Sequence, residues 1–259
     1  MNKKLFLLTL LFIFNCITAQ NAINTEVDSK FYFEAEQFVT KDVYDNYYFI
    51  TNNNLIKTNN QKTFFFKEVT LGKIEYVSVL NPLQIMVFYK DFNTVVLLDN
   101  QLNETHRIKG NNYTILFQAV DLARQNNLWF YDANSLQFGT FNFVENTFKY
   151  ISTPTSFSIK NYKSDYNQFY WITDDNHFFS INYFGKITLL QNLDALENVK
   201  IINDKAFLAK KNGKINYYIN NAIYEILVDK NSTDFFCFKD GFLSIFTNNY
   251  VTNYKIELP

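Results

Sequence analysis

Residues 83–98 read LQIMVFYKDFNTVVLL, which is two apolar runs separated by four turn-forming residues. The runs Leu83–Tyr89 and Thr94–Leu98 are rich in β-branched and aromatic side chains, which favour strands. The segment Lys90–Asn93 supplies Asp and Asn, whose short polar side chains hydrogen-bond to the local backbone in turns. This stretch predicts a β-hairpin with both faces covered, because its strands are almost continuously apolar.

The same pattern recurs six times, roughly every 40 residues, which is the spacing of a repeat architecture. A short strand precedes each hairpin and a more charged strand follows it, as in Tyr76–Leu80 and Thr105–Ile108. Units of this kind bury their apolar faces only against each other. The hairpins are predicted at residues 47–57, 83–98, 128–138, 169–181, 206–218 and 242–254.

Four strands per unit is the content of one propeller blade. The repeat resembles the broad family of six-bladed β-propellers found on exported bacterial proteins, although no Trp-Asp dipeptide or Asp-box occurs. That resemblance implies a fold and no activity. We predict an all-β chain with six four-stranded blades; a β-sandwich, a β-solenoid, and rings of five or seven blades are the alternatives.

Ring closure requires one terminus to complete a blade that the other terminus begins. Phe31–Ala35 is strand-like and precedes the first unit, whereas the last unit lacks an outer strand after residues 254–258. We predict that Phe31–Ala35 supplies this strand, because an open blade would expose an apolar edge.

The first residues have the pattern of a secretory signal. Lys3 and Lys4 precede the apolar run Leu5–Phe14, and Ala19 provides a small residue for cleavage. We predict a signal peptide at 1–19 and a single domain at 20–259, in the periplasm, at the outer membrane or outside the cell. An uncleaved anchor and a lipid on Cys16 are alternatives, and no later stretch has the ~20 apolar residues of a membrane span.

Composition argues against several classes of function. The formal net charge is −1, and the sequence contains no basic run of the kind that nucleic-acid binding requires. Cys237 follows Phe235-Phe236 and is predicted to be a small buried hydrophobe. No Cys-x-x-Cys or helix-borne histidine pair occurs, so no metal site and no cofactor are predicted.

Candidate catalytic groups are few, and we predict no catalytic residue. His106 and His177 are the two histidines of the chain, and neither lies in a recognisable motif. The turns 91–93 and 174–176 carry oxygen ligands that suit calcium, but their spacing does not match an EF-hand loop, and turn formation is the better explanation of these residues. Trp129 and Trp171 occupy equivalent strand positions, so they are predicted to pack between blades instead of forming a ligand platform.

Propellers usually bind ligands at one end of the central channel. We predict that the ligand face carries the hairpin turns and the blade-to-blade loops, with the candidate residues Asp91, Asn93, Asn134, Asp174, Asp175 and Asn212. This polar, weakly acidic ring suits a peptide, a glycan or a protein loop. The sequence favours a non-enzymatic binding or scaffolding module, with a protein or glycan partner. A hydrolase or lyase of an extracellular polymer and an accessory subunit of an outer-membrane assembly are the alternatives.

Overall fold

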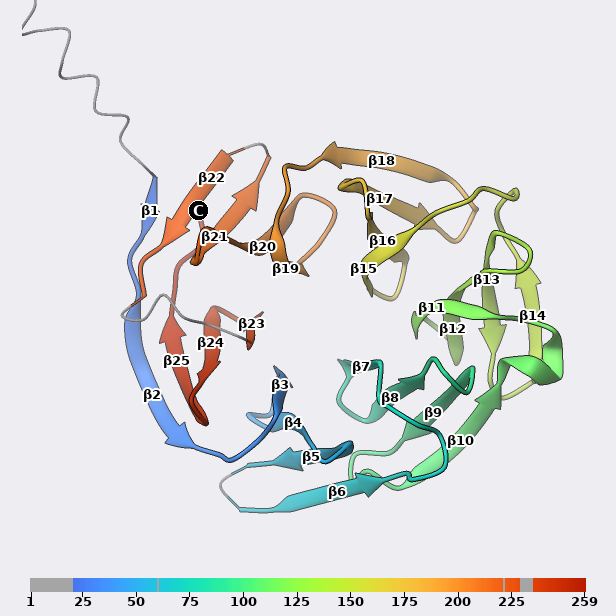
Figure 1. The fold of residues 1–259 in the computed structure, drawn as a ribbon, viewed down its shortest axis with the longest axis horizontal. Helices are drawn as coiled ribbons and strands as arrows, with labels where there is room; N and C mark the ends of the chain where they lie inside the picture. The colour runs from blue at the N-terminus through green and yellow to red at the C-terminus, as the bar shows by residue number, and fades with distance from the viewer. Residues whose placement is uncertain (1–20, 60, 221, 229–234) are drawn as a thin grey trace, which may run out of the picture.

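The computed structural model describes residues 21–59, 61–220, 222–228 and 235–259. The signal segment predicted at 1–19, with Cys16, lies outside these residues. The described chain is a six-bladed β-propeller, in which six sheets follow one another around a central axis (Figure 1). This confirms the predicted fold class and blade number.

In blades 1 to 4 the first strand is innermost and the last strand is outermost, and blades 5 and 6 follow the same order except that an N-terminal strand is added at the outer edge. Blade 1 consists of β3 (Gln37–Lys41), β4 (Tyr47–Thr51), β5 (Asn54–Thr58) and β6 (Thr63–Lys67). Blade 2 consists of β7 (Tyr76–Asn81), β8 (Gln84–Tyr89), β9 (Thr94–Leu98) and β10 (Glu104–Lys109). Blade 3 consists of β11 (Phe117–Leu122), β12 (Asn127–Asp132), β13 (Gln137–Asn142) and β14 (Thr147–Tyr150). Blade 4 contains β15 (Ile159–Ser164), β16 (Gln168–Thr173), β17 (His177–Asn182) and β18 (Ile187–Asn192). Blade 5 contains β19 (Glu197–Ile201), β20 (Ala206–Lys211), β21 (Lys214–Ile219) and β22 (Ala222–Ile226). Blade 6 contains β23 (Phe235–Lys239), β24 (Phe242–Thr247) and β25 (Tyr250–Lys255). A short 3-10 helix, η1 (Gly110–Tyr113), lies in the loop between blades 2 and 3.

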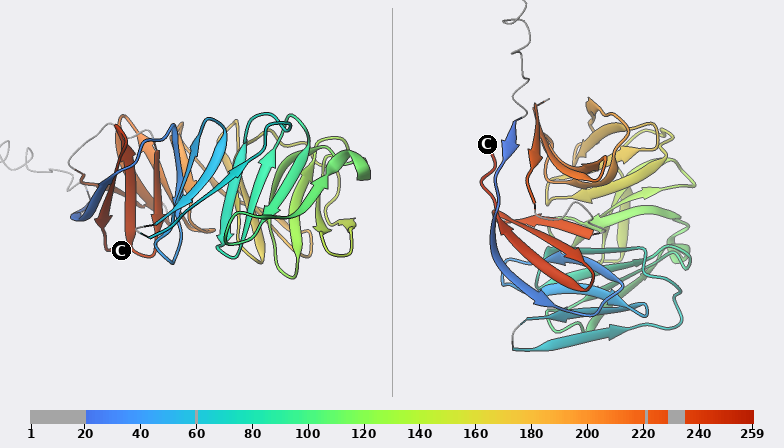
Figure 2. Two further views of the ribbon diagram at one scale, coloured as in Figure 1. Left: turned by 90° about the horizontal axis from the view of Figure 1, so that it is seen from below. Right: turned by 60° about the vertical axis from the view of Figure 1, so that its left-hand side comes forward.

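Seen from the side, the molecule is a disc whose strands run between two faces (Figure 2). Because neighbouring strands within a blade are antiparallel, all turns of one type lie on the same face. We call the face with the turns between first and second strands face A. The opposite face, face B, holds the turns between second and third strands and the loops that join the blades.

The core is divided among the blade interfaces. The described residues form six buried apolar clusters, each shared by two adjacent blades. Strand β8 shows why its sequence is apolar throughout: Ile85, Val87 and Tyr89 pack toward blade 1, whereas Met86 and Phe88 pack toward blade 3. A strand buried on both faces cannot alternate between apolar and polar residues.

The N-terminal segment closes the ring, as predicted, but with a different strand. Strand β2 (Glu26–Tyr32) pairs antiparallel with β25 and becomes the outer strand of blade 6. The prediction of Phe31–Ala35 was therefore wrong in its bounds, because Phe33 leaves the sheet and stacks on Phe49 of blade 1 with ring centroids 4.2 Å apart. One further strand, β1 (Ala22–Ile23), pairs parallel with β22 and gives blade 5 a fifth strand.

Asparagine provides the backbone conformations of the turns on face B. Asn52, Asn53, Asn93, Asn176 and Asn212 all have positive φ, and so do Asn248 and Asn249. Asn tolerates the left-handed region because its side chain hydrogen-bonds locally. Asparagine therefore takes the turn positions that glycine often occupies in β-proteins, and the chain needs only six glycines. Within the described ranges, no helix is long and apolar enough to cross a membrane.

Candidate functional site

A cavity of about 410 Å³ lies on the axis of the ring, and all six inner strands line it. β3, β7, β11, β15, β19 and β23 each contribute side chains, so the cavity is the central channel of the propeller. Its ionisable lining is mostly cationic, with five lysines against two carboxylates: Lys41, Lys160, Lys163, Lys200, Lys239, Glu75 and Asp121. The channel is thus positively charged although the chain as a whole carries a net charge of −1.

Four of these lysines lie toward face A. Lys41 and Lys239 are the last residues of their inner strands, and Lys163 and Lys200 are the residues before the last. Inner strands run from the blade-to-blade loops on face B to the turns on face A. The fifth lysine, Lys160, stands near the start of β15, toward face B.

Lys163 has its ammonium inside the channel wall. Its Nζ donates hydrogen bonds to the carbonyl oxygens of Ile201 (3.1 Å) and Ile202 (3.3 Å), at the end of the inner strand of blade 5. Burial lowers the pKa of Lys163; the negative charge of Asp121 opposes this effect, and the like charge of Lys239 adds to it. Lys163 therefore spans two blades and interacts electrostatically with another lysine of the channel.

Lys200 lines the same cavity next to Cys237. Burial lowers the pKa of Lys200, and the Cys237 sulfur opposes this shift weakly. Cys237 is buried, as predicted, and burial raises the pKa of its thiol. The two residues place a cation and a neutral thiol side by side in the channel.

Lys41 differs from these two lysines because it has a carboxylate partner. Its Nζ lies 2.7 Å from Oδ1 of Asp45 and 4.8 Å from the centroid of the Phe242 ring. Burial acts to lower the pKa of Lys41, but the hydrogen bond and the charge of Asp45 outweigh it, so the net shift is upward. The charge of Lys41 is therefore already compensated.

Asp121 is the buried carboxylate of the channel wall. Its Oδ1 accepts the Leu122 N–H (2.7 Å), and its Oδ2 accepts the Ser164 N–H (2.7 Å) and the Tyr76 hydroxyl (3.1 Å). Burial raises the pKa of Asp121, and hydrogen bonds from the Ser78 side chain, from the Ser164 backbone and side chain and from the Leu122 backbone oppose this shift. Because Tyr76, Asp121 and Ser164 belong to three different blades, this carboxyl joins blades 2, 3 and 4 around the channel.

Two of the three aromatic side chains that line the cavity, Tyr76 and Tyr162, pack against each other, and the third is Phe238. The rings of Tyr76 and Tyr162 are 4.5 Å apart at an interplanar angle of 44°, and Tyr162 also stacks on Phe169 at 5.6 Å. Trp129 and Trp171 have no exposed surface and lie in the cluster between blades 3 and 4. The prediction that these tryptophans form core is confirmed.

The residues proposed from the sequence occupy turns on face B, and none of them lines the channel cavity. Asp91, Asn134, Asp174, Asp175 and Asn212 are exposed. The sixth, Asn93, is buried; its Nδ2 donates to the Ile115 carbonyl oxygen (2.7 Å) and its Oδ1 accepts the Phe117 N–H (2.9 Å). Where the structure describes the chain, no two of these six side chains hydrogen-bond to each other.

Neither histidine lies in the channel. His106 is in outer strand β10, where its ring packs edge-on against Phe143 at 5.1 Å. His177 begins β17, and its Nδ1 lies 2.9 Å from Oδ2 of Asp175. A search of the described residues finds no group of three His, Cys, Asp or Glu side chains that could hold a metal ion.

The channel lysines could not be found as a basic run in the sequence. Four of the six blades contribute them, and only Lys160 and Lys163 share a strand, so most of them are separated by tens of residues and form no basic run. A usable signal exists in hindsight: Lys41, Lys163, Lys200 and Lys239 occupy the last or second-last position of a short strand that precedes a predicted hairpin.

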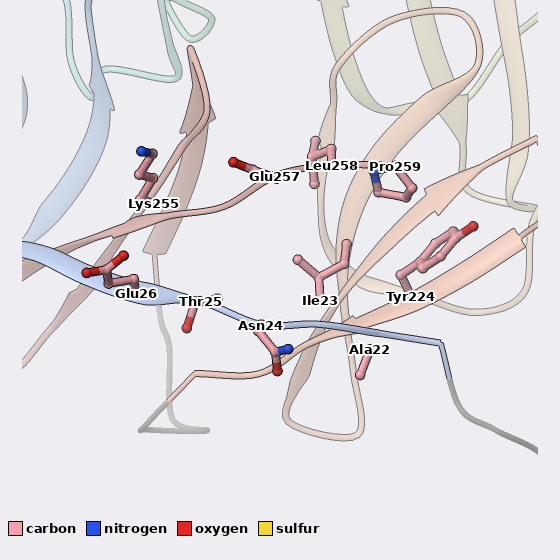
Figure 3. A pocket seen from close by; sticks show the side chains of 10 residues that line it. All are labelled: Ala22, Ile23, Asn24, Thr25, Glu26, Tyr224, Lys255, Glu257, Leu258 and Pro259. Carbon is pink, nitrogen blue, oxygen red and sulfur yellow. The ribbon is translucent and has the colours of Figure 1, made fainter.

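A second hollow, of about 630 Å³, lies at the outer edge of the ring. It is bounded by the segment that crosses from β1 to β2 and by the C-terminal tail, which run past each other in Figure 3. Its charged residues are Glu26, Lys255 and Glu257, a mixed set at a strand edge. The channel is the better candidate site, because charge of one sign converges there from several blades.

Comparison with solved structures places the chain among β-propellers. Residues covering 89% of this chain match 99% of virginiamycin B lyase from Staphylococcus aureus, solved as a catalytically inactive histidine-to-alanine variant with quinupristin, with a TM-score of 0.63 and 11% identity. A protein of unknown function from Bacteroides thetaiotaomicron matches with a TM-score of 0.61 at 13% identity, over 92% of this chain and 74% of that one.

A member of the DUF4221 family from Bacteroides vulgatus matches over 92% of this chain and 99% of that one, with a TM-score of 0.59 and 8% identity. No family model matches the chain, and no curated protein matches it. At these identities, the comparisons support the propeller fold and carry no activity over to this chain.

Proposed function

We propose that this chain is an exported, non-enzymatic binding module that holds a segment of a protein partner in its central channel. The observation that carries the proposal is a channel lined by all six blades, with lysines from blades 4, 5 and 6 gathered at face A. The basic and apolar start of the sequence, residues 1–19, supports export.

The carboxylates of the channel argue against polymer hydrolysis. Glycoside hydrolysis generally uses two carboxyl groups that face each other across the scissile bond. Among the described residues that line the cavity, Asp121 is engaged by three donors, and Glu75 precedes β7 on the side of face B. The lyase on this fold is inactive when a histidine is replaced, whereas His106 and His177 lie away from the channel of this chain.

The channel wall favours a peptide segment over a glycan. Sugar sites commonly offer an aromatic face for stacking. Here Tyr76 and Tyr162 pack against each other, and Trp129 and Trp171 are buried between blades. The other polar groups of the wall include lysine ammonium groups and the amide side chains of Gln37 and Asn161, which suit the charged side chains and main chain of a peptide.

Site-specific photo-crosslinking in intact cells tests this proposal. Phe238 lines the channel, whereas Phe92 is exposed in a turn on face B, so a photoreactive phenylalanine analogue replaces an aromatic ring at either position. We expect a defined protein adduct from position 238 and none from position 92. Adducts from position 92 alone, or a polysaccharide adduct at position 238, would overturn the proposal.

Identification of the adduct by mass spectrometry also tests the location. A periplasmic or outer-membrane partner, including a subunit of an outer-membrane assembly, agrees with an exported binding module. A cytoplasmic protein as the adduct at position 238 would contradict export. The melting temperature of each analogue-bearing protein serves as the control that the ring is still folded.

A further inference from the structure

We propose that the face A end of the channel is a carboxylate-binding site, which recognises Glu or Asp side chains of an acidic peptide segment. This inference rests on the proposed function and specifies its ligand. The site consists of Lys163, Lys200 and Lys239, which come from the inner strands of blades 4, 5 and 6.

The three lysines of this site have no carboxylate partner among the described residues. In the described chain, no carboxylate lies within salt-bridge distance of Lys163, Lys200 or Lys239. Lys163 donates to two backbone carbonyl oxygens, which are neutral acceptors. The buried carboxylate of the channel, Asp121, is already occupied by donors from three blades. Buried charges in proteins are normally paired, so three cations that share one cavity without a carboxylate at salt-bridge distance leave the position of a directly bound anion open.

In the free protein, the three lysines bear an electrostatic cost from lost hydration and mutual repulsion. Two of the lysines, Lys163 and Lys200, lie where burial disfavours their charged form. Lys239 repels Lys163 across the cavity. A carboxylate between these groups would offset the repulsion and the lost hydration at once. Binding energy is therefore available to an anion that enters this end of the cavity.

The size of the cavity and the chemistry of lysine favour a carboxylate over other anions. The cavity of about 410 Å³ is enclosed by six blades, so a flexible side chain can enter it and a nucleic-acid duplex cannot. Lysine acts as a point charge, whereas bidentate binding of phosphate is better served by arginine. These features favour peptide carboxylates.

Isothermal titration calorimetry of the mature protein provides the test, with hexaglutamate as the probe and hexaglutamine as the uncharged match. We expect hexaglutamate to bind and hexaglutamine not to bind. The double variant Lys163→Gln with Lys200→Gln is expected to weaken hexaglutamate binding by more than about tenfold. The matched control, Lys73→Gln with Lys205→Gln, removes two exposed lysines and is expected to leave the affinity within about twofold of the wild type.

Two further probes distinguish other anions. If oligogalacturonate or tripolyphosphate binds through the same lysines and hexaglutamate does not, the site takes an acidic glycan or a phosphate and the proposal is wrong. Absence of binding for all three anions also overturns it. In that case an adduct at position 238 would still support a channel partner, so the two proposals fail separately.

The lysine variant carries its own folding control. Removing two poorly hydrated charges is expected to leave the melting temperature unchanged or to raise it. A folded double variant that still binds hexaglutamate like the wild type would contradict the assignment of these residues.

Discussion

The Tyr76 hydroxyl donates a hydrogen bond of 3.1 Å to Oδ2 of Asp121, and this contact joins blade 2 to blade 3 at the channel wall. The same carboxylate oxygen accepts the Ser164 N–H of blade 4 at 2.7 Å. One buried side chain therefore holds three consecutive blades in register. Buried polar groups are costly unless all their partners are present, so the surroundings of Asp121 should be sensitive to substitution.

The variant Asp121→Asn is expected to lower the free energy of unfolding by about 3 kcal/mol, because an amide N–H₂ would face a donor. Tyr76→Phe removes one donor and should cost about 1 kcal/mol. Urea unfolding of both variants measures the difference. Equal losses would mean that Asp121 acts through Tyr76 alone and does not join three blades.

Asp121 should also affect the pH dependence of stability. Burial raises its pKa above the ordinary value of 3.8, so above pH 3.8 the folded state keeps a proton that the unfolded chain releases. The contribution of this group to stability is largest below pH 3.8 and falls as the pH rises through the folded pKa. The difference in stability between wild type and Asp121→Asn is expected to shrink over that range, and a difference that grows with pH would contradict it.

Glu68 should show the opposite sign. It accepts the hydroxyl (2.6 Å) and the N–H (2.8 Å) of Thr70 and lies 2.6 Å from the Arg107 guanidinium of β10. The Thr70 hydrogen bonds and then Arg107 lower the pKa of Glu68 from 4.5 to about 2. Its ionised form therefore stabilises the fold above pH 4.5, and this stabilisation is lost as the pH falls from 4.5 to 2.

The variant Glu68→Gln is expected to cost about 1 kcal/mol at pH 7, after allowance for solvent screening at the surface. The difference from the wild type should vanish by about pH 2. The exposed Glu145 supplies the control, since Glu145→Gln should change stability little at any pH. Thermal melts between pH 2 and 7 measure both variants, and a constant deficit for Glu68→Gln would show that its charge is not involved.

Truncation tests the closure of the ring by the N-terminal strand. A protein that starts at residue 36 lacks β2, so β25 becomes an exposed edge strand. It also loses the hydrogen bond between Asn253 and Ser29 (2.9 Å) and the ring contact between Phe31 and Tyr47 (4.7 Å between centroids). We expect its melting temperature to fall by about 10 °C or more. A protein that starts at residue 26 loses only β1, with the buried Ile23, and should lose a few degrees. An unchanged melting temperature for the shorter protein would show that β2 does not close the ring.

The fold could be read from the sequence because the blade interfaces impose a local pattern. In β8 the apolar residues Ile85 and Met86 serve two different interfaces, so the strand is apolar throughout and contrasts clearly with its turn. The recurrence of these apolar hairpins gave the period of the repeat. The bounds of β2 were missed because its sequence, EVDSKFY, is largely exposed and has little apolar signal. The apolar residues that followed, such as Phe33, pack against blade 1 instead.

The candidate site was much harder to predict, for a physical reason. Lys163 and Lys200 are neighbours only because the ring places the ends of β15 and β19 around one axis. No local pattern records which end of an inner strand reaches which face. The sequence singled out turn residues such as Asn93 and Asn212 because they adopt positive φ in the turns. A local sequence pattern indicates such a backbone role but does not indicate a ligand.

Residue-resolved lysine acetylation, followed by mass spectrometry across a pH series, tests the convergence of lysines in the channel most directly. Burial lowers the pKa of Lys163 and Lys200, so we predict that both are acetylated at lower pH in the folded protein than in the urea-unfolded protein, and that hexaglutamate protects Lys163, Lys200 and Lys239 together in the folded protein. If Lys163 and Lys200 react at the same pH in the folded and the unfolded protein, and hexaglutamate protects none of the three lysines, they do not form one carboxylate site.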